Sequence, residues 1–432
     1  MLDNVWRNKK LLAFALFNAA LFLILSFMRV TLTPDSAGYI GDSFLRAPVY
    51  PLLIAFFKLL VPAHFLRAVV IFQTAAVLAA VIGLAAEIRR RFGLSDLFFM
   101  LVYLVLLWPL LPFSGGFIGA QIMTEAAAYA LFLFAALCLC RGLALKDARW
   151  LAAFVCLGCG SVLIKPQFLF MPLSAAAIVA AEYCSARNAR RTLVLLGALV
   201  LSFGASALFG RVYNYARHGI FKPCPGLGYH AAMNALFLSD DSAAALFSDP
   251  AERAAFEDLY GKVKAAGMRA ADFGGLGVAA YASFSTGVFN PVVWDIVVPS
   301  LAAYCPAGAG ADACLLHEDA LGMKIAKKIL MHRPAAYIKL LVYKLLAGTP
   351  LYYWFFIMAV FWLSGWLFMV RGSARAGLLF CAILMNLVNY AGVGSFTPFM
   401  LRLTFHAEFL HAAVLLAALW ACFSLAQKQA DP

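Results

Sequence analysis

Long apolar segments recur along this chain, and they restrict its fold more than any other feature. Segments of roughly 20 apolar residues are about the length of a helix that crosses a bilayer. Of the 432 residues, 64% are hydrophobic and only 13% are charged, whereas a soluble domain is about half apolar and about a quarter charged. The sequence therefore predicts an all-α polytopic membrane protein.

About ten segments are expected to cross the membrane as helices. They are residues 11–31, 66–87, 97–112, 118–140, 150–165, 168–184, 192–210, 350–370, 376–392 and 406–426. The first is longer than the apolar core of a signal peptide, and no cleavage site follows it cleanly, so we expect it to be retained as a helix.

Basic residues fall in clusters between these segments. The clusters are Arg89 to Arg91, Arg141 with Lys146 and Arg149, Arg187 with Arg190 and Arg191, Arg371 with Arg375, and Lys428. Because cytoplasmic loops are enriched in lysine and arginine, all of these clusters are predicted to lie in the cytoplasm. The net charge of +13 follows from the same rule. No nucleic-acid partner is expected, since no basic patch on a soluble domain is evident.

Three regions follow from this pattern. Residues 1–210 form an N-terminal transmembrane module that includes a first loop at 31–65, residues 211–349 form an extracytoplasmic α-rich region, and residues 350–432 return to the membrane. Within the middle region, Asp249 and Pro250 predict the start of a helix, with Phe256, Leu259, Tyr260 and Val263 on one face. After Pro334, the stretch AAYIKLLVYKLLAG predicts an interfacial helix with snorkelling Lys339 and Lys344.

Two cysteines of the middle region are candidates for a disulfide. Cys305 and Cys314 bracket the flexible stretch PAGAGADA. If this region lies outside the cytoplasm, the environment permits disulfides. We therefore expect these two cysteines to be bonded, which leaves Cys224 over.

The first loop, TPDSAGYIGDSFLRAPVYP from Thr33 to Pro51, carries more polar chemistry than a simple connection needs. It contains Asp35, Asp42 and Arg46 between turn-forming glycines and prolines. An interfacial helix pair with capping aspartates is the bland alternative.

Other ionisable residues are predicted at the same edge of the membrane. Glu125 opens one helix, Lys165 precedes Pro166 in a short helix break, and Arg402 and His406 begin the last helix. Charges at the edge of apolar segments are usually paired or functional, because burying them singly is costly.

Each of these residues also has a purely structural interpretation. Glu125 suits a helix N-terminus, and Lys165 could snorkel towards lipid phosphates. Arg402 could anchor the helix at the interface, His406 could be structural, and Asp42 could be a turn residue after Gly41.

At these residues the sequence resembles the membrane-embedded GT-C glycosyltransferases that use polyprenyl-phosphate sugars. The bacterial branch near the protein O-mannosyltransferases and the lipid A aminoarabinose transferase is the most similar in pattern. The resemblance rests on PDSAGY with RAPVYP, on MTEAAAY, on LIKPQFLFMP and on MLRLTF. Two departures concern the donor: Asp35 is followed by Ser36 where many relatives have a second acid, and Leu403 stands where many have tyrosine.

The resemblance implies a GT-C-like bundle in the bacterial inner membrane, with an active site that faces the periplasm. Asp35 would be the catalytic base, and Lys165, Arg402 and Arg46 would hold the donor phosphate. Tyr39 could stack on a sugar, and Asp42, Glu125 and His406 are expected to contact substrate. The partners would be a polyprenyl-phosphate sugar, membrane lipid, and a glycan, glycolipid or protein acceptor.

Two other functions and a metal site are alternatives to a metal-free transferase. Transporters and lipid flippases place ionisable residues near the bilayer midplane, often with inverted repeats, and neither feature is evident here. A non-catalytic subunit would use Asp35 for assembly. Asp35, Asp42 and Glu125 could converge on a hard divalent cation, although we favour a reaction without a cofactor.

Overall fold

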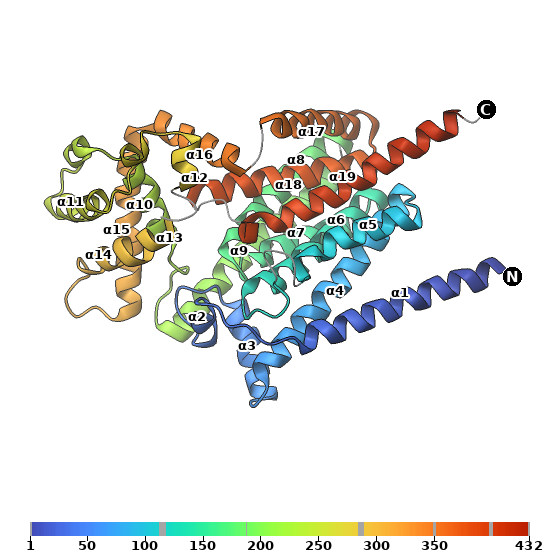
Figure 1. Cartoon of the computed structure of the whole chain (residues 1–432), viewed down its shortest axis with the longest axis horizontal. Coiled ribbons are helices and arrows are strands. Elements are labelled where there is room, and N and C mark those ends of the chain that lie inside the picture. Colours follow the sequence, from blue (N-terminus) through green and yellow to red (C-terminus); the bar gives the residue numbers. More distant parts are fainter. Residues whose placement is uncertain are drawn as a thin grey trace. The chain divides into compact units, whose positions relative to one another are not determined.

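Helices form the described part of the chain. The computed structural model describes residues 2–111, 118–186, 188–283, 289–348, 351–396 and 401–430. No strand occurs in these ranges, where the β pairing is one isolated parallel bridge between Thr31 and Gln121. The predicted all-α class is confirmed (Figure 1).

Seven described helices are long and apolar enough to cross a membrane, so the chain is a multi-pass membrane protein. They contain Lys9–Phe27, Phe65–Phe92, Thr124–Leu145, Ala189–His218, Tyr352–Arg371, Ala374–Gly392 and His406–Ser424. The other expected crossings, at 97–112, 150–165 and 168–184, fall on the shorter apolar helices Asp96–Leu110, Ala148–Ser161 and Pro166–Ala181. The predicted count of about ten therefore includes three helices that are shorter than the roughly 20 residues of a typical crossing.

The chain divides into two units. The first comprises residues 1–210, 360–386 and 405–432, and the second comprises 211–359 and 387–404. The helices of the first unit are α1 (Leu2–Phe27), α2 (Ser36–Ile40), α3 (Val49–Leu60), α4 (Phe65–Phe92), α5 (Asp96–Leu107), α6 (Thr124–Leu145), α7 (Ala148–Ser161) and α8 (Phe170–Ala186). Four longer helices have residues in both units: α9 (Ala189–His218), α17 (Leu351–Arg371), α18 (Ala374–Phe396) and α19 (Leu401–Ala430).

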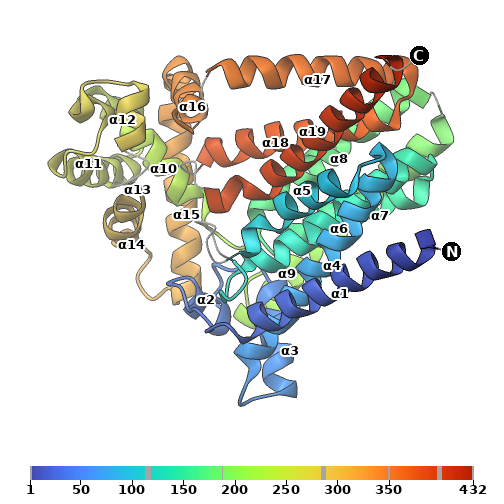
Figure 2. The same cartoon turned by 45° about the vertical axis from the view of Figure 1, so that its right-hand side comes forward.

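Helix α6 is the most enclosed element of the first unit. It packs against both α4 and α7 (Figure 2). Its buried residues include several alanines and Gly142, and small side chains let neighbouring helix backbones approach closely. The start of α6 is thereby fixed relative to α4, where Gln73 Nε2 donates to the Gln121 carbonyl oxygen just before α6.

Two helix boundaries differ from the sequence prediction for reasons that lie far away in the chain. Helix α1 ends at Phe27 and not at residue 31, because Arg67 Nη1 of α4 donates hydrogen bonds to the carbonyl groups of Ser26 and Met28. Helix α6 begins at Thr124 and not at 118, because the backbone before it pairs with Thr31.

The second unit is built around the buried helix α10 (Leu227–Leu238), which packs on α15 (Ala311–His332). Its other helices are α11 (Pro250–Ala265), α12 (Val278–Ser283), α13 (Phe289–Pro291), α14 (Val298–Ala302) and α16 (Pro334–Gly348). The predicted helix start is confirmed, since Asp249 Oδ1 accepts hydrogen bonds from the amides of Ala251 and Glu252. The four residues expected on its inner face are all buried.

The interfacial prediction for Lys344 is wrong. Its side chain is fully buried in the second unit, and its Nζ donates to Asn234 Oδ1 of α10 at 2.8 Å. A snorkelling lysine would keep its ammonium in water. Instead, Lys344 ties α16 to the buried α10. In the same unit, Cys305 and Cys314 are joined in a disulfide.

The crossing of α10 and α15 predicts a strong effect of a single methyl group. A Cβ atom at Gly228 would lie 1.8 Å from the carbonyl oxygen of Asp319, whereas one at Gly261 of α11 would meet open space. We expect Gly228→Ala to cost at least about 1–3 kcal/mol of unfolding free energy and Gly261→Ala to be neutral or stabilising. Thermal unfolding of both variants in detergent measures this, and equal midpoints would contradict the described helix crossing.

Candidate functional site

Three segments meet at one end of the first unit. They are the first loop, the stretch before α6, and the helix break between α7 and α8. Thr31 N donates to Ala120 O at 2.9 Å and Ile122 N donates to Thr31 O at 3.1 Å, while Val49 N donates to Leu163 O at 3.0 Å. These backbone bonds place the loop against the two regions that carry Glu125 and Lys165.

The first loop folds as two short helices, α2 and α3, joined by a turn. Asp35 stands at the N-cap position of α2, but its side chain makes no capping bond there. Its Oδ1 instead accepts from Arg46 Nη2 at 2.8 Å. The loop therefore contains a helix pair, as in the bland alternative, but the Asp35 side chain has an ion-pair partner and no capping bond.

Gly38 makes room for the Arg46 side chain. A Cβ atom at this position would lie 2.8 Å from Arg46 Nε. The guanidinium lies 4.7 Å from the centre of the Tyr39 ring, within the range of a cation–π contact. Burial lowers the pKa of Arg46, but Tyr39 and Asp35 outweigh this effect and raise the pKa overall. Arg46 therefore stays charged beside Asp35.

Tyr39 links this pair to the start of α6. Its hydroxyl lies 3.4 Å from Thr124 Oγ1, and Thr124 Oγ1 donates to Glu125 Oε2 at 3.3 Å. Burial raises the pKa of Tyr39, so the phenol keeps its proton at neutral pH. Because Thr124 donates its own proton to Glu125, the Tyr39 hydroxyl is the donor to Thr124 Oγ1.

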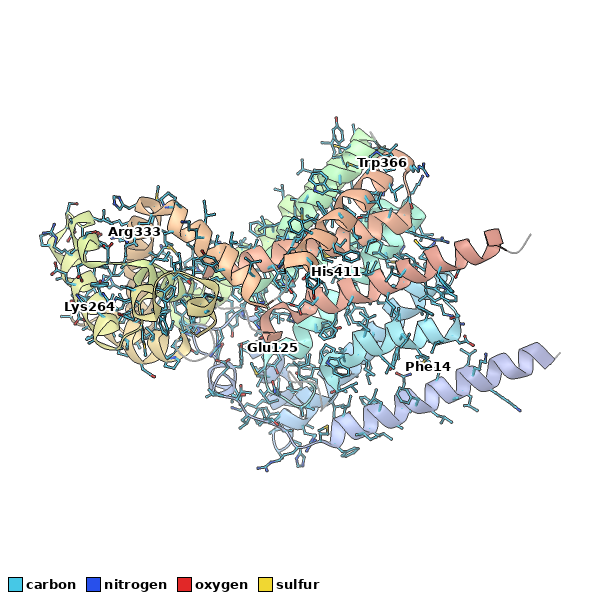
Figure 3. All side chains as sticks on the ribbon, turned by 45° about the horizontal axis from the view of Figure 1, so that its top comes forward. Phe14, Glu125, Lys264, Arg333, Trp366 and His411 are labelled. Atoms are coloured by element: carbon cyan, nitrogen blue, oxygen red, sulfur yellow. A yellow bond between two sulfur atoms is a disulfide. The ribbon has the colours of Figure 1, made fainter. Side chains whose placement is uncertain are left out.

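Glu125 and Lys165 form the second ion pair. Lys165 Nζ donates to Glu125 Oε1 at 2.8 Å, and the two side chains are 14% and 4% exposed. Glu125 lies at the start of α6 (Figure 3), and Lys165 occupies the extended residue before Pro166. An ammonium group has three N–H donors, so Lys165 can bind Glu125 and a further anion together.

His406 is buried among aromatic side chains of the first unit. The residue is fully buried, and its ring lies 4.7 Å from the ring centre of Phe168 and 5.8 Å from that of Tyr129. The packing of His406 among aromatic rings fits the structural interpretation more closely than direct contact with substrate.

The other two predicted residues are Asp42 and Arg402. Asp42 has a φ of 55°, a left-handed turn conformation that aspartate tolerates. Arg402 belongs to the first turn of α19, and its side chain lies outside the part of the chain that the structure describes.

Residues not singled out in the sequence hold the site together. Ser36 Oγ donates to Ile122 O at 2.9 Å and accepts from Thr33 N at 2.8 Å. Gln73, fully buried in α4, accepts from the Tyr50 hydroxyl at 3.2 Å and donates to Gln121 O at 2.9 Å. A glutamine inside an apolar segment was the signal that could have identified Gln73, because a buried amide needs partners.

The carboxylates of the site are paired with cations and not with one another. Asp35 binds Arg46, and Glu125 binds Lys165. Among the described residues, no group of three histidine, cysteine, aspartate or glutamate side chains lies close enough to hold a metal ion. The arrangement offers an accessible carboxylate, 32% exposed on Asp35, beside Arg46. Lys165, the second cation suited to a phosphate, is linked to them through Glu125, Thr124 and Tyr39.

Comparison of the chain with protein-family models, with curated proteins and with solved structures finds no match. The resemblance to the GT-C glycosyltransferases therefore stays a prediction from the sequence.

The buried pair predicts strong coupling between its two members. Lys165→Met would leave the Glu125 carboxylate buried without this partner, which should cost about 3–5 kcal/mol of unfolding free energy. The double variant Lys165→Met/Glu125→Gln removes both charges and should recover much of that loss. Unfolding of Lys165→Met, Glu125→Gln and the double variant in detergent measures the coupling. Strictly additive losses would argue against a buried pair.

Proposed function

We propose that the protein is an inverting GT-C-type glycosyltransferase. It would move a sugar from a polyprenyl-phosphate donor to an acceptor hydroxyl at the periplasmic face of the bacterial inner membrane. One observation carries this proposal: Asp35, Arg46, Tyr39, Glu125 and Lys165 form one connected network at the end of helices that can cross a membrane.

Asp35 is the carboxylate best suited to act as the base. Its side chain is 32% exposed, whereas that of Glu125 is 4% exposed and bonded to Lys165. In the proposed step, Asp35 takes the proton of the acceptor hydroxyl as its oxygen bonds to the anomeric carbon. The bond from that carbon to the phosphate oxygen breaks, and its electrons leave with the polyprenyl phosphate. General-base assistance of this kind contributes about 10²–10⁴-fold to a rate.

The cations are suited to the leaving group. Negative charge grows on the phosphate as the bond breaks, and fixed positive groups stabilise such charge. Arg46 presents a planar fork of donors, while Lys165 acts as a point charge. Glu125 would position Lys165 through their hydrogen bond, so we assign it a positioning role and not a substrate contact.

The resting ion pair gives a reason for the order of events. Arg46 Nη2 occupies Asp35 Oδ1 while the two are paired. A donor phosphate that engages Arg46 would take this partner from Asp35. The carboxylate oxygen would then be open to the acceptor hydroxyl once a donor is in place.

Asp35→Asn tests the proposed chemistry. Purified protein in detergent is offered a panel of polyprenyl-phosphate sugars with crude envelope acceptor, and released polyprenyl phosphate is measured. We expect Asp35→Asn to fall by about 10²–10⁴-fold, while Asp96→Asn, which removes an exposed carboxylate paired with Lys10 and Arg89, keeps wild-type release.

Equal release from wild type and Asp35→Asn would remove Asp35 as the base. In vesicles that contain the protein, the donor lipid could instead cross the vesicle membrane while neither wild type nor Asp35→Asn releases polyprenyl phosphate. That result would replace the transferase with a lipid transporter.

A further inference from the structure

Arginine side chains gather at the other end of the first unit. Glu87, near the end of α4, is 4% exposed and accepts from Arg90 Nη2 and Arg91 Nε at 2.7 Å, with Arg141 Nε at 3.6 Å. Arg141 lies near the end of α6, and Glu125 lies at its start. At 1.5 Å per residue the two are about 24 Å apart along the helix, so this arginine cluster is separate from the candidate active site.

Positive charge exceeds negative charge in this arginine cluster. One carboxylate faces three guanidinium groups, and Arg375 adds a fourth by donating from Nε to the Arg91 carbonyl oxygen at 2.8 Å. Arg91 Nη2 is buried without a hydrogen-bond partner. The excess of guanidinium groups over carboxylates favours an anion at this end of the unit.

A cavity opens beside Arg91. It has a volume of about 360 Å³ and lies between the ends of α4 and α6 and the start of α18. Arg91, Arg375 and Ser373 supply its polar wall, and Phe92, Cys140 and Leu378 supply apolar surface. Among the described residues that line it, none is acidic, since Glu87 faces a different cavity. The space therefore combines two guanidinium groups, a hydroxyl and an apolar floor.

We propose that this cavity binds the phosphate group of an anionic phospholipid. Arginine donors and a serine hydroxyl match phosphate oxygens, and the volume is within the usual range for small-ligand sites. The cavity lies at the ends of helices that can cross a membrane, which is the level of lipid headgroups. Basic pockets between transmembrane helices are suited to anionic headgroups, and the apolar floor suits the glycerol and upper acyl carbons.

This site is independent of the proposed transferase chemistry. None of its residues belongs to the network of Asp35 and Lys165, and its ligand would be a lipid of the membrane and not a sugar donor. It would hold α4, α6 and the loop between α17 and α18 together from the headgroup side.

Binding of short-chain lipids to the full-length protein in detergent tests the proposal. The probes are dihexanoyl phosphatidylglycerol, dihexanoyl phosphatidylcholine and inorganic phosphate, measured by calorimetric titration. We expect phosphatidylglycerol to bind at least about tenfold more tightly than phosphatidylcholine, whose phosphate is neutralised by its own ammonium. Arg375→Gln should weaken phosphatidylglycerol binding about tenfold or more.

Control variants keep this test decisive. Arg375 is an exposed residue, so Arg375→Gln should fold, and Ser373→Ala provides a second variant of the same wall. Arg149→Gln, whose side chain is 94% exposed and outside the cavity, should bind like wild type.

The three probes also distinguish the source of the phosphate. Inorganic phosphate that binds as tightly as phosphatidylglycerol, with the same loss in Arg375→Gln, would support the phosphate site but assign it to a soluble anion. Equal affinity for both lipids, or wild-type affinity in Arg375→Gln, would overturn the proposal.

Discussion

The ion pair between Glu125 and Lys165 is the interaction on which the site end of the first unit depends. Either charge alone at that depth would cost several kcal/mol, because desolvation is repaid only by close pairing and hydrogen bonding. With Nζ and Oε1 at 2.8 Å, the pair joins the start of α6 to the helix break before Pro166. The first loop contacts the segments that carry both residues of the pair. Tyr39 contacts Thr124 next to Glu125, and Val49 bonds to Leu163 near Lys165.

Charge is distributed differently at the two ends of this unit. At the site end, Asp35 offsets Arg46 and Glu125 offsets Lys165, so an incoming phosphate would have to compete with Asp35 for Arg46. In the proposed mechanism, donor binding to Arg46 would release the Asp35 carboxylate for the acceptor hydroxyl. At the other end, Glu87 is outnumbered by arginines. An anion there would offset the excess positive charge without displacing a carboxylate, which suits a stable structural ligand more than a reacting one.

Local patterns in the sequence predicted much of this architecture, and long-range pairing decided the rest. Apolar length predicted the helices, and the spacing of Phe256, Leu259, Tyr260 and Val263 predicted the buried face of α11. The grouping of Asp35, Glu125 and Lys165 at one end of the first unit followed from where charges interrupt apolar segments. The bonding partners of individual residues could not be predicted from the sequence. Lys344 bonds to Asn234, 110 residues away, and pairing with Thr31 delays the start of α6. Such contacts depend on how helices pack, which composition and periodicity do not encode.

Photo-crosslinking of a polyprenyl-phosphate analogue, with a diazirine next to its phosphate, tests the central claim most directly. Our account places the donor phosphate between Arg46 and Lys165. Labelled peptides should therefore map to residues 36–46 and 161–169, and excess unlabelled donor should remove the label. Labelling confined to the arginine cluster around Glu87, or labelling of residues 36–46 and 161–169 that unlabelled donor does not reduce, would contradict the account.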